Sequence, residues 1–268
     1  MSNNLITDAA ADLWAAQRDC APICPVTRSY PGLDVDAAYA IQQVNLRRWL
    51  GAGAALAGRK IGLTSAPMQT LLGVDEPDYG YILDNMVIGP GAVADPARFC
   101  APRVEPEVAF LLCHSLRGPG VTVADVHAAT EAVAVALEIV DSRIANWELT
   151  LADTVADNAS SGAVMLGDWV PFDDSIDLAA TVATLQLNGA DVDTGCGSAV
   201  LGDPAAAVAW LANTLANYGT EIAAGQFVMS GSYTAAVFVH PGDNAAATIT
   251  GLGSVSVQFD QEAKTHAS

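Results

Sequence analysis

Basic residues are scarce in this chain of 268 residues. Lysine and arginine together number 11, against 30 aspartates and glutamates, so the formal net charge is −19 at pH 7. A protein that binds nucleic acid needs a basic surface against the phosphates, and anionic membranes attract basic segments. We therefore expect no nucleic acid and no membrane among the partners of this protein.

Long apolar runs are also missing. No run approaches the roughly 18 apolar residues of a membrane-spanning helix. Residues 1–10 lack the basic and apolar regions of a signal peptide, so we expect a cytoplasmic protein. Hydrophobic residues nevertheless make up 51% of the chain and charged residues only 15%, which excludes a disordered acidic protein. The length supports one large domain or two small ones.

Histidine and cysteine are too few, and too scattered, for two common kinds of site. None of the four histidines lies in the polar motifs described below, so a Ser-His-Asp or Cys-His arrangement has little support. The cysteines form no CxxC pair and have no histidine at zinc spacing, which predicts reduced thiols in the core. They are Cys20, Cys24, Cys100, Cys113 and Cys196.

Apolar periodicity and capping residues predict several helices. One covers residues 8–20, and a second begins after Asp34. Thr122 is a predicted cap for a helix that runs to about Ala134, and Asp203 precedes a proline at the start of another.

The remaining apolar segments predict a β-rich region. Asn188 and Gly189 form a strong hairpin signal after one of these segments. We expect a helical N-terminal region, residues 1–58, packed on one mixed β domain of residues 59–268 as a single structural unit. The predicted strands cover residues 60–63, 104–113, 135–140, 182–187, 226–229, 233–239 and 255–259.

Three carboxylates lie in segments that are otherwise apolar enough to be buried. Glu105 and Glu107 are two residues apart in a predicted strand and therefore share a face. Glu138 interrupts another apolar strand, where an unpaired carboxylate is costly. If the two strands are neighbours, three carboxylates converge, and such an all-oxygen site suits Mg²⁺ or Mn²⁺.

A structural alternative stays open for the same residues. Glu105 and Glu107 could line the solvent face of an edge strand, a position that Pro106 tolerates. Glu138 could then pair with Arg143 or Arg103. Spacing alone does not decide between this arrangement and a metal site, because structural ion pairs are common.

Three further stretches are rich in small and polar residues. Lys60 stands between glycines at 58 and 62, where it could hold an anion, act as a base, or simply be exposed beside a turn. Asp78 lies in a Pro- and Gly-containing segment, 73–80, which is typical of a solvated loop but could supply an acid or base. The third stretch, 153–162, could orient a carboxylate or form an ordinary capped loop.

Together these motifs resemble one family. The chain is similar to the 2-keto-4-pentenoate hydratases (2-hydroxypenta-2,4-dienoate hydratases), which belong with the 4-oxalocrotonate decarboxylases to the fumarylacetoacetate hydrolase superfamily. The similarity covers nearly the whole chain. The matching segments are residues 30–32, 73–80, 104–108, 137–144, 156–161, 200–202, 209–212, 230–232, 241–243 and 251–255, with the segment around Lys60.

The resemblance implies an α+β fold: a mixed β-roll core, like the C-terminal domain of fumarylacetoacetate hydrolase, with a helical N-terminal region. It implies a homo-oligomer and a bound Mg²⁺ or Mn²⁺. The family commonly has a Trp-Lys pair where this chain has Trp147 and Glu148. The roles that it implies are metal ligation by Glu105, Glu107 and Glu138, catalysis by Lys60 and Asp78, and binding of the 2-oxo acid end by Leu72 and Ser160.

The activity implied by the resemblance is metal-dependent hydration of a 2-hydroxy-2,4-dienoate, a small anionic 2-oxo acid substrate of aromatic meta-cleavage catabolism, to a 4-hydroxy-2-oxo acid. A decarboxylase of a 2-oxo-3-hexenedioate (4-oxalocrotonate) is the main alternative, and Arg59 could then hold the second carboxylate. An acylpyruvate-type hydrolase and a non-catalytic subunit rank lower. A pathway decarboxylase or aldolase is a further possible partner.

Overall fold

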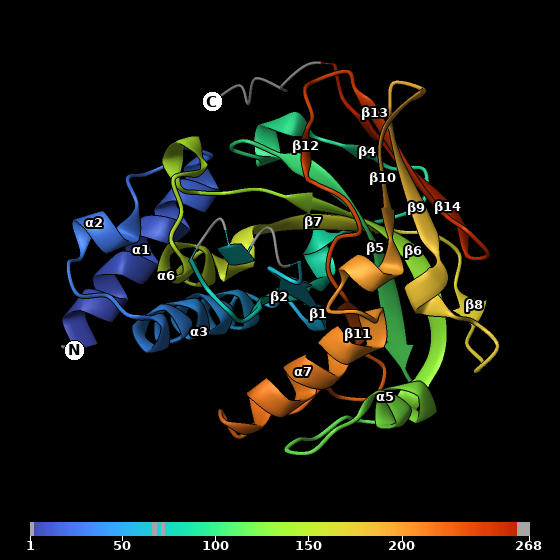
Figure 1. Cartoon of the computed structure of the whole chain (residues 1–268). Helices are drawn as coiled ribbons and strands as arrows, with labels where there is room; N and C mark the ends of the chain where they lie inside the picture. The colour runs from blue at the N-terminus through green and yellow to red at the C-terminus, as the bar shows by residue number, and fades with distance from the viewer. Residues whose placement is uncertain (1–2, 66–68, 71–72, 262–268) are drawn as a thin grey trace.

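Two β-sheets form the centre of the protein (Figure 1). The computed structural model describes residues 3–65, 69–70 and 73–261. Within them the larger sheet has nine strands, with β12 pairing to β5 and β8 pairing to β6 beside the main path. In order, the main path is β2 (Asp78–Leu83), β1 (Leu56–Gly62), β11 (Phe227–Met229), β5 (Arg103–Leu112), β6 (Thr130–Val140), β7 (Ser161–Leu166) and β3 (Val87–Ile88), with β12 (Val237–Phe238) and β8 (Val170–Pro171) added.

The smaller sheet packs against the long strands β5, β6 and β7 of the larger one, at the right of Figure 1. It contains five strands among the described residues. Together the two sheets form the mixed β core that the sequence predicted. In order, the strands are β10 (Ala190–Cys196), β9 (Val182–Leu187), β13 (Asn244–Ile249), β14 (Gly253–Phe259) and β4 (Val93–Ala94).

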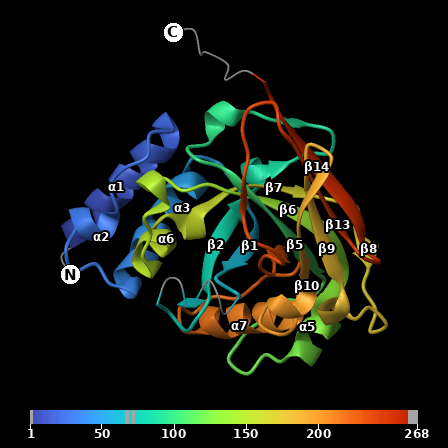
Figure 2. The same cartoon turned by 45° about the horizontal axis from the view of Figure 1, so that its top comes forward.

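The helices with bounds within the described residues lie in two groups. Four of them gather on the N-terminal side of the larger sheet, and two lie together at its lower edge (Figures 1 and 2). This arrangement confirms the predicted α+β class with a helical N-terminal region. The first group is α1 (Asn3–Asp19), α2 (Val26–Ser29), α3 (Val35–Gly51) and α6 (Leu151–Ala156), the second α5 (Val123–Ala129) and α7 (Pro204–Ala216). Short 3₁₀ turns are η1 (Asp84–Met86), η2 (Pro96–Arg98), η3 (Ala145–Trp147), η4 (Asn158–Ser160), η5 (Leu178–Ala180) and η6 (Gly197–Ala199).

Three of the predicted helix starts are confirmed by side-chain caps, whereas the first helix begins at Asn3 rather than at residue 8. Asp34 accepts a hydrogen bond from the amide of Ala37, Thr122 forms a capping box with Asp125, and Asp203 caps the helix that begins at Pro204. The predicted hairpin is confirmed as the β9–β10 pair.

Further predicted boundaries are wrong. The strand expected over residues 60–63 begins at Leu56. The helix capped by Thr122 ends at Ala129, and β6 begins at Thr130, because residues 130–140 pair with β5 along almost their whole length. Sheet pairing there overrides the helix propensity of the alanines. The strand expected over residues 233–239 is limited to Val237 and Phe238.

The strand that carries Glu105 and Glu107 is an interior strand. β6 pairs with one side of β5, and β11 and β12 pair with the other. The edge-strand alternative is therefore wrong. Pro106 is tolerated because it lies between the β11 and β12 pairings, where its carbonyl accepts a hydrogen bond from the amide of Tyr233.

The cysteines are free, as predicted, but they are not core residues. Cys24 and Cys113 are exposed, and the other three are partly buried. The expectation of core thiols is wrong because each cysteine lies in a turn or at the end of an element rather than on a buried face.

One described segment, residues 197–216, is long and apolar enough to span a membrane by length and composition alone, and half of it is buried in this fold. Its helix α7 packs against β1 and α5. The apolar character of α7 therefore has a structural explanation within the core.

Leu137 is fully buried on the interior strand β6. We expect Leu137→Ala to lower the free energy of unfolding by about 2–5 kcal/mol, because it removes buried contacts and leaves a cavity. Leu50→Ala is the matched control, since Leu50 is 42% exposed on α3. Urea unfolding measures both, and equal losses would contradict the assignment of β6 to the core.

Candidate metal centre and active site

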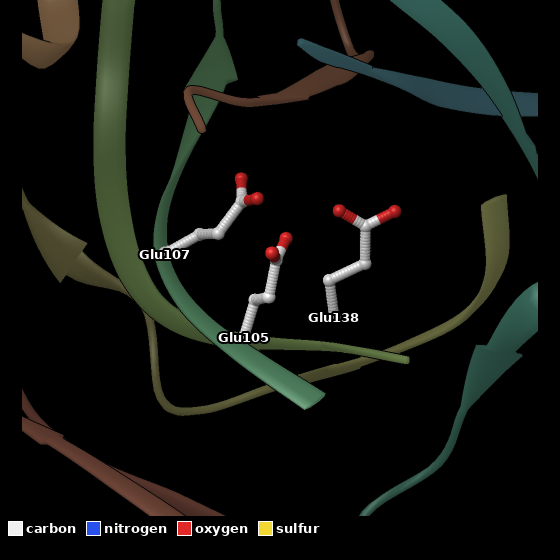
Figure 3. A group of neighbouring side chains, drawn as sticks. All are labelled: Glu105, Glu107 and Glu138. Atoms are coloured by element: carbon white, nitrogen blue, oxygen red, sulfur yellow. The ribbon is translucent and has the colours of Figure 1, made fainter. Parts of the chain in front are cut away.

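Three carboxylates converge beside the paired strands β5 and β6. Glu105 lies directly opposite Glu138 in the β5–β6 register, so the two side chains share one face, and Glu107 follows on that face. One ligand oxygen from each residue lies within 4.8 Å of the other two. Figure 3 shows the three side chains pointing into the same space. The convergence predicted from the sequence is confirmed.

The hydrogen bonding of these carboxylates is incomplete. Glu138 is fully buried, and neither of its oxygens has a hydrogen-bond partner among the described residues. Glu107 Oε2 accepts one hydrogen bond, 2.8 Å long, from the amide of Gly231. Lys60 Nζ lies 3.4 Å from Glu138 Oε1 and supplies a single positive charge. Buried carboxylates with unpartnered oxygens form a donor set that fits a divalent cation.

The protein groups around the cluster do not balance three negative charges. Burial, together with repulsion from Glu138, raises the pKa of Glu105 to about 7. Burial raises the pKa of Glu107 well above its usual range, with Glu138 and Glu105 adding to the shift. Burial also raises the pKa of Glu138, although attraction to Lys60 opposes this.

Lys60 stays charged in this setting. Burial lowers the pKa of its ammonium group, but the attraction of Glu138, Asp78 and the other carboxylates outweighs burial and raises it overall. Only 4% of Lys60 is exposed, so the alternative of an exposed lysine beside a turn is wrong.

A cavity of about 260 Å³ opens beside the carboxylates. Glu105 lines it, whereas Glu107 and Glu138 are not among its lining residues. Leu72 lies outside the described residues. The other lining residues used below are Lys60, Asp78, Arg103, Trp147, Thr154 and Ser160.

A chain of polar side chains links two of the predicted residues. Thr154 Oγ1 donates to Asp78 Oδ2 at 3.3 Å, and it lies 3.4 Å from Ser160 Oγ. Asp78 Oδ1 is buried and has no hydrogen-bond partner among the described residues. Burial raises the pKa of Asp78, while Lys60 and the Thr154 hydroxyl oppose the shift. An added Cβ on Gly62 would lie 2.2 Å from Asp78 Oδ1, so this close approach requires glycine.

Thr154 is a site residue that the sequence did not single out. It belongs to the small, polar stretch 153–162, and that stretch was the only signal. Whether a given hydroxyl in such a stretch faces a cavity or a helix cap depends on how α6 packs.

Ser160 is held by an unusual turn. The three residues Asn158–Ser160 all have positive φ, near 50–56°, a conformation that costs L-residues about 1–2 kcal/mol each. The Asn158 amide exchanges two 2.9 Å hydrogen bonds with the backbone of Tyr81. Buried Arg143 donates to the Asp157 carboxylate at 2.5 Å and to the Ser161 carbonyl at 2.8 Å. These clamps compensate for the backbone strain.

Arg143 is therefore not the partner of Glu138, because its carboxylate partner is Asp157. Arg103 is not that partner either, since it forms no salt bridge within the described part of the chain. The cation next to Glu138 is Lys60.

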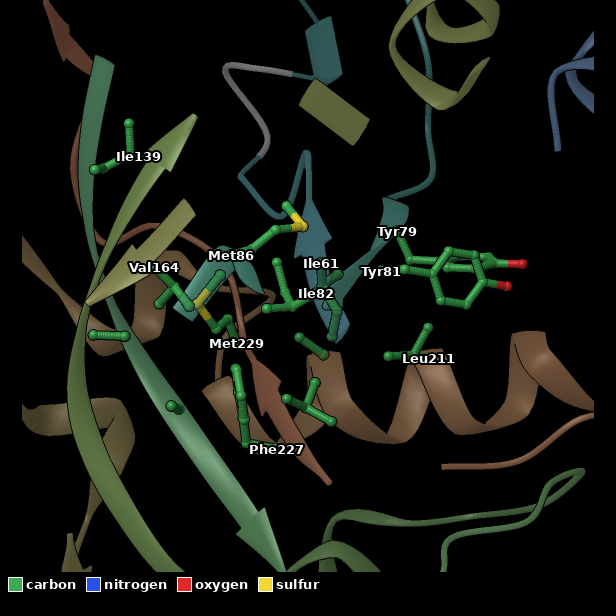
Figure 4. Packing of buried hydrophobic residues seen from close by; sticks show 14 of the residues in the cluster. Ile61, Tyr79, Tyr81, Ile82, Met86, Ile139, Val164, Leu211, Phe227 and Met229 are labelled. Carbon is green, nitrogen blue, oxygen red and sulfur yellow. The ribbon is translucent and has the colours of Figure 1, made fainter. Parts of the chain in front are cut away.

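Arg59 does not lie at the cavity. Alternation along β1 places Lys60 toward the carboxylates and Arg59 on the opposite face, together with Ile61. Figure 4 shows Ile61 in the apolar cluster above α7. Arg59 donates instead to Gln226 Oε1 at 2.6 Å. The suggestion that Arg59 could hold a second substrate carboxylate is wrong.

A protein-family model matches most of the chain. Residues 53–260 match the fumarylacetoacetate (FAA) hydrolase C-terminal model. The chain belongs to the fumarylacetoacetate hydrolase family. This membership agrees with the resemblance found in the sequence, and the family model includes every described residue of the carboxylate cluster and cavity named above.

Curated relatives within the family are hydratases. The chain is 43% identical to a 2-hydroxyhexa-2,4-dienoate hydratase of Comamonas testosteroni, over 93% of this chain and 95% of the relative. It is 42% identical to a 2-keto-4-pentenoate hydratase of Paraburkholderia xenovorans, over 94% of both chains.

A solved structure within the family is a decarboxylase. It is the 4-oxalocrotonate decarboxylase of Pseudomonas putida G7, complexed with magnesium and adipate. It matches with a TM-score of 0.93 and 36% identity, and the match covers 97% of this chain and 98% of that one.

The raised pKa of Glu105 should make the free energy of unfolding depend on pH. The folded-state pKa, about 7, exceeds the ordinary value of 4.5, so the folded protein holds this proton more tightly than the unfolded chain does. In EDTA, the free energy of unfolding should therefore fall as the pH rises from about 4.5 to 7. We expect Glu105→Gln to flatten this fall in urea unfolding at several pH values.

The control for this measurement is Glu131→Gln, because Glu131 is exposed on β6. It should keep the wild-type slope. A wild-type slope in Glu105→Gln as well would contradict the electrostatic description of the site.

Proposed function

We propose that this protein is a metal-dependent hydratase of the 2-keto-4-pentenoate type. It adds water to a 2-hydroxy-2,4-dienoate and gives a 4-hydroxy-2-oxo acid. The observation that carries the proposal is the cluster of three converging carboxylates next to a cavity lined by Lys60 and Asp78. Within this cluster Glu138 is fully buried, and neither of its oxygens has a hydrogen-bond partner among the described residues. Identity of 42–43% with curated hydratases over almost the whole chain supports the reaction class.

In this proposal Glu105, Glu107 and Glu138 hold Mg²⁺ or Mn²⁺. The magnesium in the 36%-identical decarboxylase structure supports the choice of ion. When bound, such an ion supplies a Lewis acid that stabilises negative charge on the 2-oxygen of the substrate.

Asp78 is the proposed proton carrier. Its raised pKa and unpartnered Oδ1 suit a group that gives and takes a proton inside the cavity. In the reaction the proton of the 2-hydroxyl is lost and a proton is added at C5. Water then adds across C3 and C4, with the hydroxyl on C4 and the proton on C3. Lys60 keeps its positive charge and holds the anionic substrate beside the carboxylates.

Ser160, held by the left-handed turn, is proposed to orient the 2-oxo acid end of the substrate, together with Leu72. The homo-oligomer, the division near residue 58 and a pathway decarboxylase or aldolase as partner stay predictions. Gel filtration with light scattering would measure the oligomer.

The metal site is tested by Glu107→Gln and Glu138→Gln, made separately, with Glu131→Gln as the exposed control. Loss of a direct carboxylate ligand should weaken Mg²⁺ and Mn²⁺ binding, measured by calorimetry, by about 100-fold or more, because even partners one shell out contribute 10–100-fold. The loss of dienoate absorbance should slow by at least as much. Full activity and unchanged metal dependence in both variants would overturn the assignment.

The decarboxylase alternative is favoured by the 36%-identical structure. The wild-type protein should be given a 2-hydroxy-2,4-dienoate and, separately, a 2-oxo-3-hexenedioate, with product identification and CO₂ detection. Hydration of the dienoate without CO₂ release from the enedioate supports the proposal. CO₂ release without hydration would replace it with decarboxylation.

Thr154 provides a test of the proton carrier. The hydrogen bond from Thr154 lowers the pKa of Asp78. Thr154→Val removes this hydrogen bond, so the pKa of Asp78 should rise. We expect kcat to fall about tenfold, because the loss of one hydrogen bond costs about 1.4 kcal/mol. The limb of the pH–kcat profile that belongs to Asp78 should move to higher pH. Thr184→Val on β9 should leave the profile unchanged, and an unmoved limb in Thr154→Val would contradict the role of Asp78.

A further inference from the structure

Arg103 lies in the cavity wall and has no role in the reaction proposed above. It lines the cavity together with Lys60 and Glu105. On β5 it precedes Glu105 by two residues, so Glu107, Glu105 and Arg103 follow one another along one face. Glu107 is 1% exposed, whereas Glu105 and Arg103 are partly exposed. Arg103 therefore stands at the solvent-facing end of the row.

The guanidinium group of Arg103 lies over two aromatic rings. Its Cζ lies 4.2 Å from the ring centroid of Trp147 and 4.1 Å from that of Phe238. Phe238 is the β12 partner of Arg103 in the sheet register. Trp147 is fixed by a 3.2 Å hydrogen bond from its indole to the carbonyl of Ala101.

This arrangement leaves the donors of Arg103 unused. Its Nε is buried without a hydrogen-bond partner, and the guanidinium forms no salt bridge with any described residue. Contact with aromatic rings uses none of the N–H groups of a guanidinium, which can donate to a carboxylate. A fixed, unpaired arginine in the wall of a cavity matches an anionic ligand.

We propose that Arg103 binds a carboxylate group of the substrate, with Trp147 and Phe238 as the residues that position it. The inference rests on the proposed function for the class of substrate, a 2-oxo acid. The carboxylate is either the one next to the 2-oxo group or a second one at the far end of a dicarboxylic substrate. Binding of a monocarboxylic and a dicarboxylic analogue distinguishes the two.

The test uses two unreactive analogues of equal carbon number, 2-oxohexanoate and 2-oxoadipate, which differ by a terminal methyl or carboxylate. Calorimetry with Mg²⁺ gives the dissociation constants for wild type, Arg103→Gln, Arg103→Lys and the control Arg47→Gln, since Arg47 is exposed on α3. We expect Arg103→Gln to weaken binding at least tenfold, Arg103→Lys to recover part of it, and the control to match wild type.

The pattern of losses separates the two sources. Weaker binding of both analogues assigns Arg103 to the carboxylate beside the 2-oxo group, and weaker binding of 2-oxoadipate alone assigns it to the distal carboxylate. Binding of both to Arg103→Gln within twofold of wild type overturns the proposal, as does a wild type that binds neither. Because no turnover is measured, these results are independent of the hydration assay.

Weaker binding in Arg103→Gln could also come from lost packing against Trp147 and Phe238, and a second variant separates this effect from the loss of charge. Phe238→Leu removes one ring and keeps the charge of Arg103. We expect a loss of affinity smaller than that of Arg103→Gln, with an unchanged thermal midpoint. A loss in Phe238→Leu equal to that in Arg103→Gln would show that packing, rather than the charge, governs binding, and would overturn the proposal.

Discussion

The cross-strand pairing of Glu105 with Glu138 is the constraint on which the site depends. It places two carboxylates on the same face of neighbouring strands, and Glu107 adds a third. Burial raises the pKa of all three, repulsion from Glu138 adds to the shifts of Glu105 and Glu107, and Lys60 offsets only one negative charge. Such an arrangement is costly without a further cation. The fold retains it, and this retention argues for a function at the cluster.

The surrounding structure keeps this costly group in place. β5 and β6 are interior strands, covered by the second sheet, so the register between them cannot slip without exposing the core. On the other side of the cavity, the left-handed turn Asn158–Ser160 is clamped by Arg143 and by the Asn158 amide. Strain and repulsion are therefore concentrated at the cavity, and well-paired elements on both sides compensate for them.

The net charge of −19 describes the surface of the protein but not this cavity. An acidic protein repels an anionic substrate at long range. Within the cavity wall, however, Lys60 and Arg103 supply positive charge, and a divalent ion at the carboxylates would add two more. Under the proposed function these positive charges offset the carboxylates where a 2-oxo acid would bind, so affinity for the substrate should depend on the bound ion.

The sequence by itself determined the α+β class, the helix caps, the β9–β10 hairpin, and the shared face of Glu105 and Glu107. These features depend on local periodicity and on capping chemistry, which are written in neighbouring residues. Local pattern left open whether Glu138 meets them and whether Lys60 faces a cavity, although the family resemblance implied both. The tertiary structure brings the three carboxylates together, turns Lys60 rather than Arg59 toward the cavity, and adds Thr154 and Arg103 to its lining. Alternation along a strand gives two faces but does not say which one is turned toward a site. That choice is made by register and by the packing of segments distant in the chain, such as β12 and α6, which no local pattern encodes.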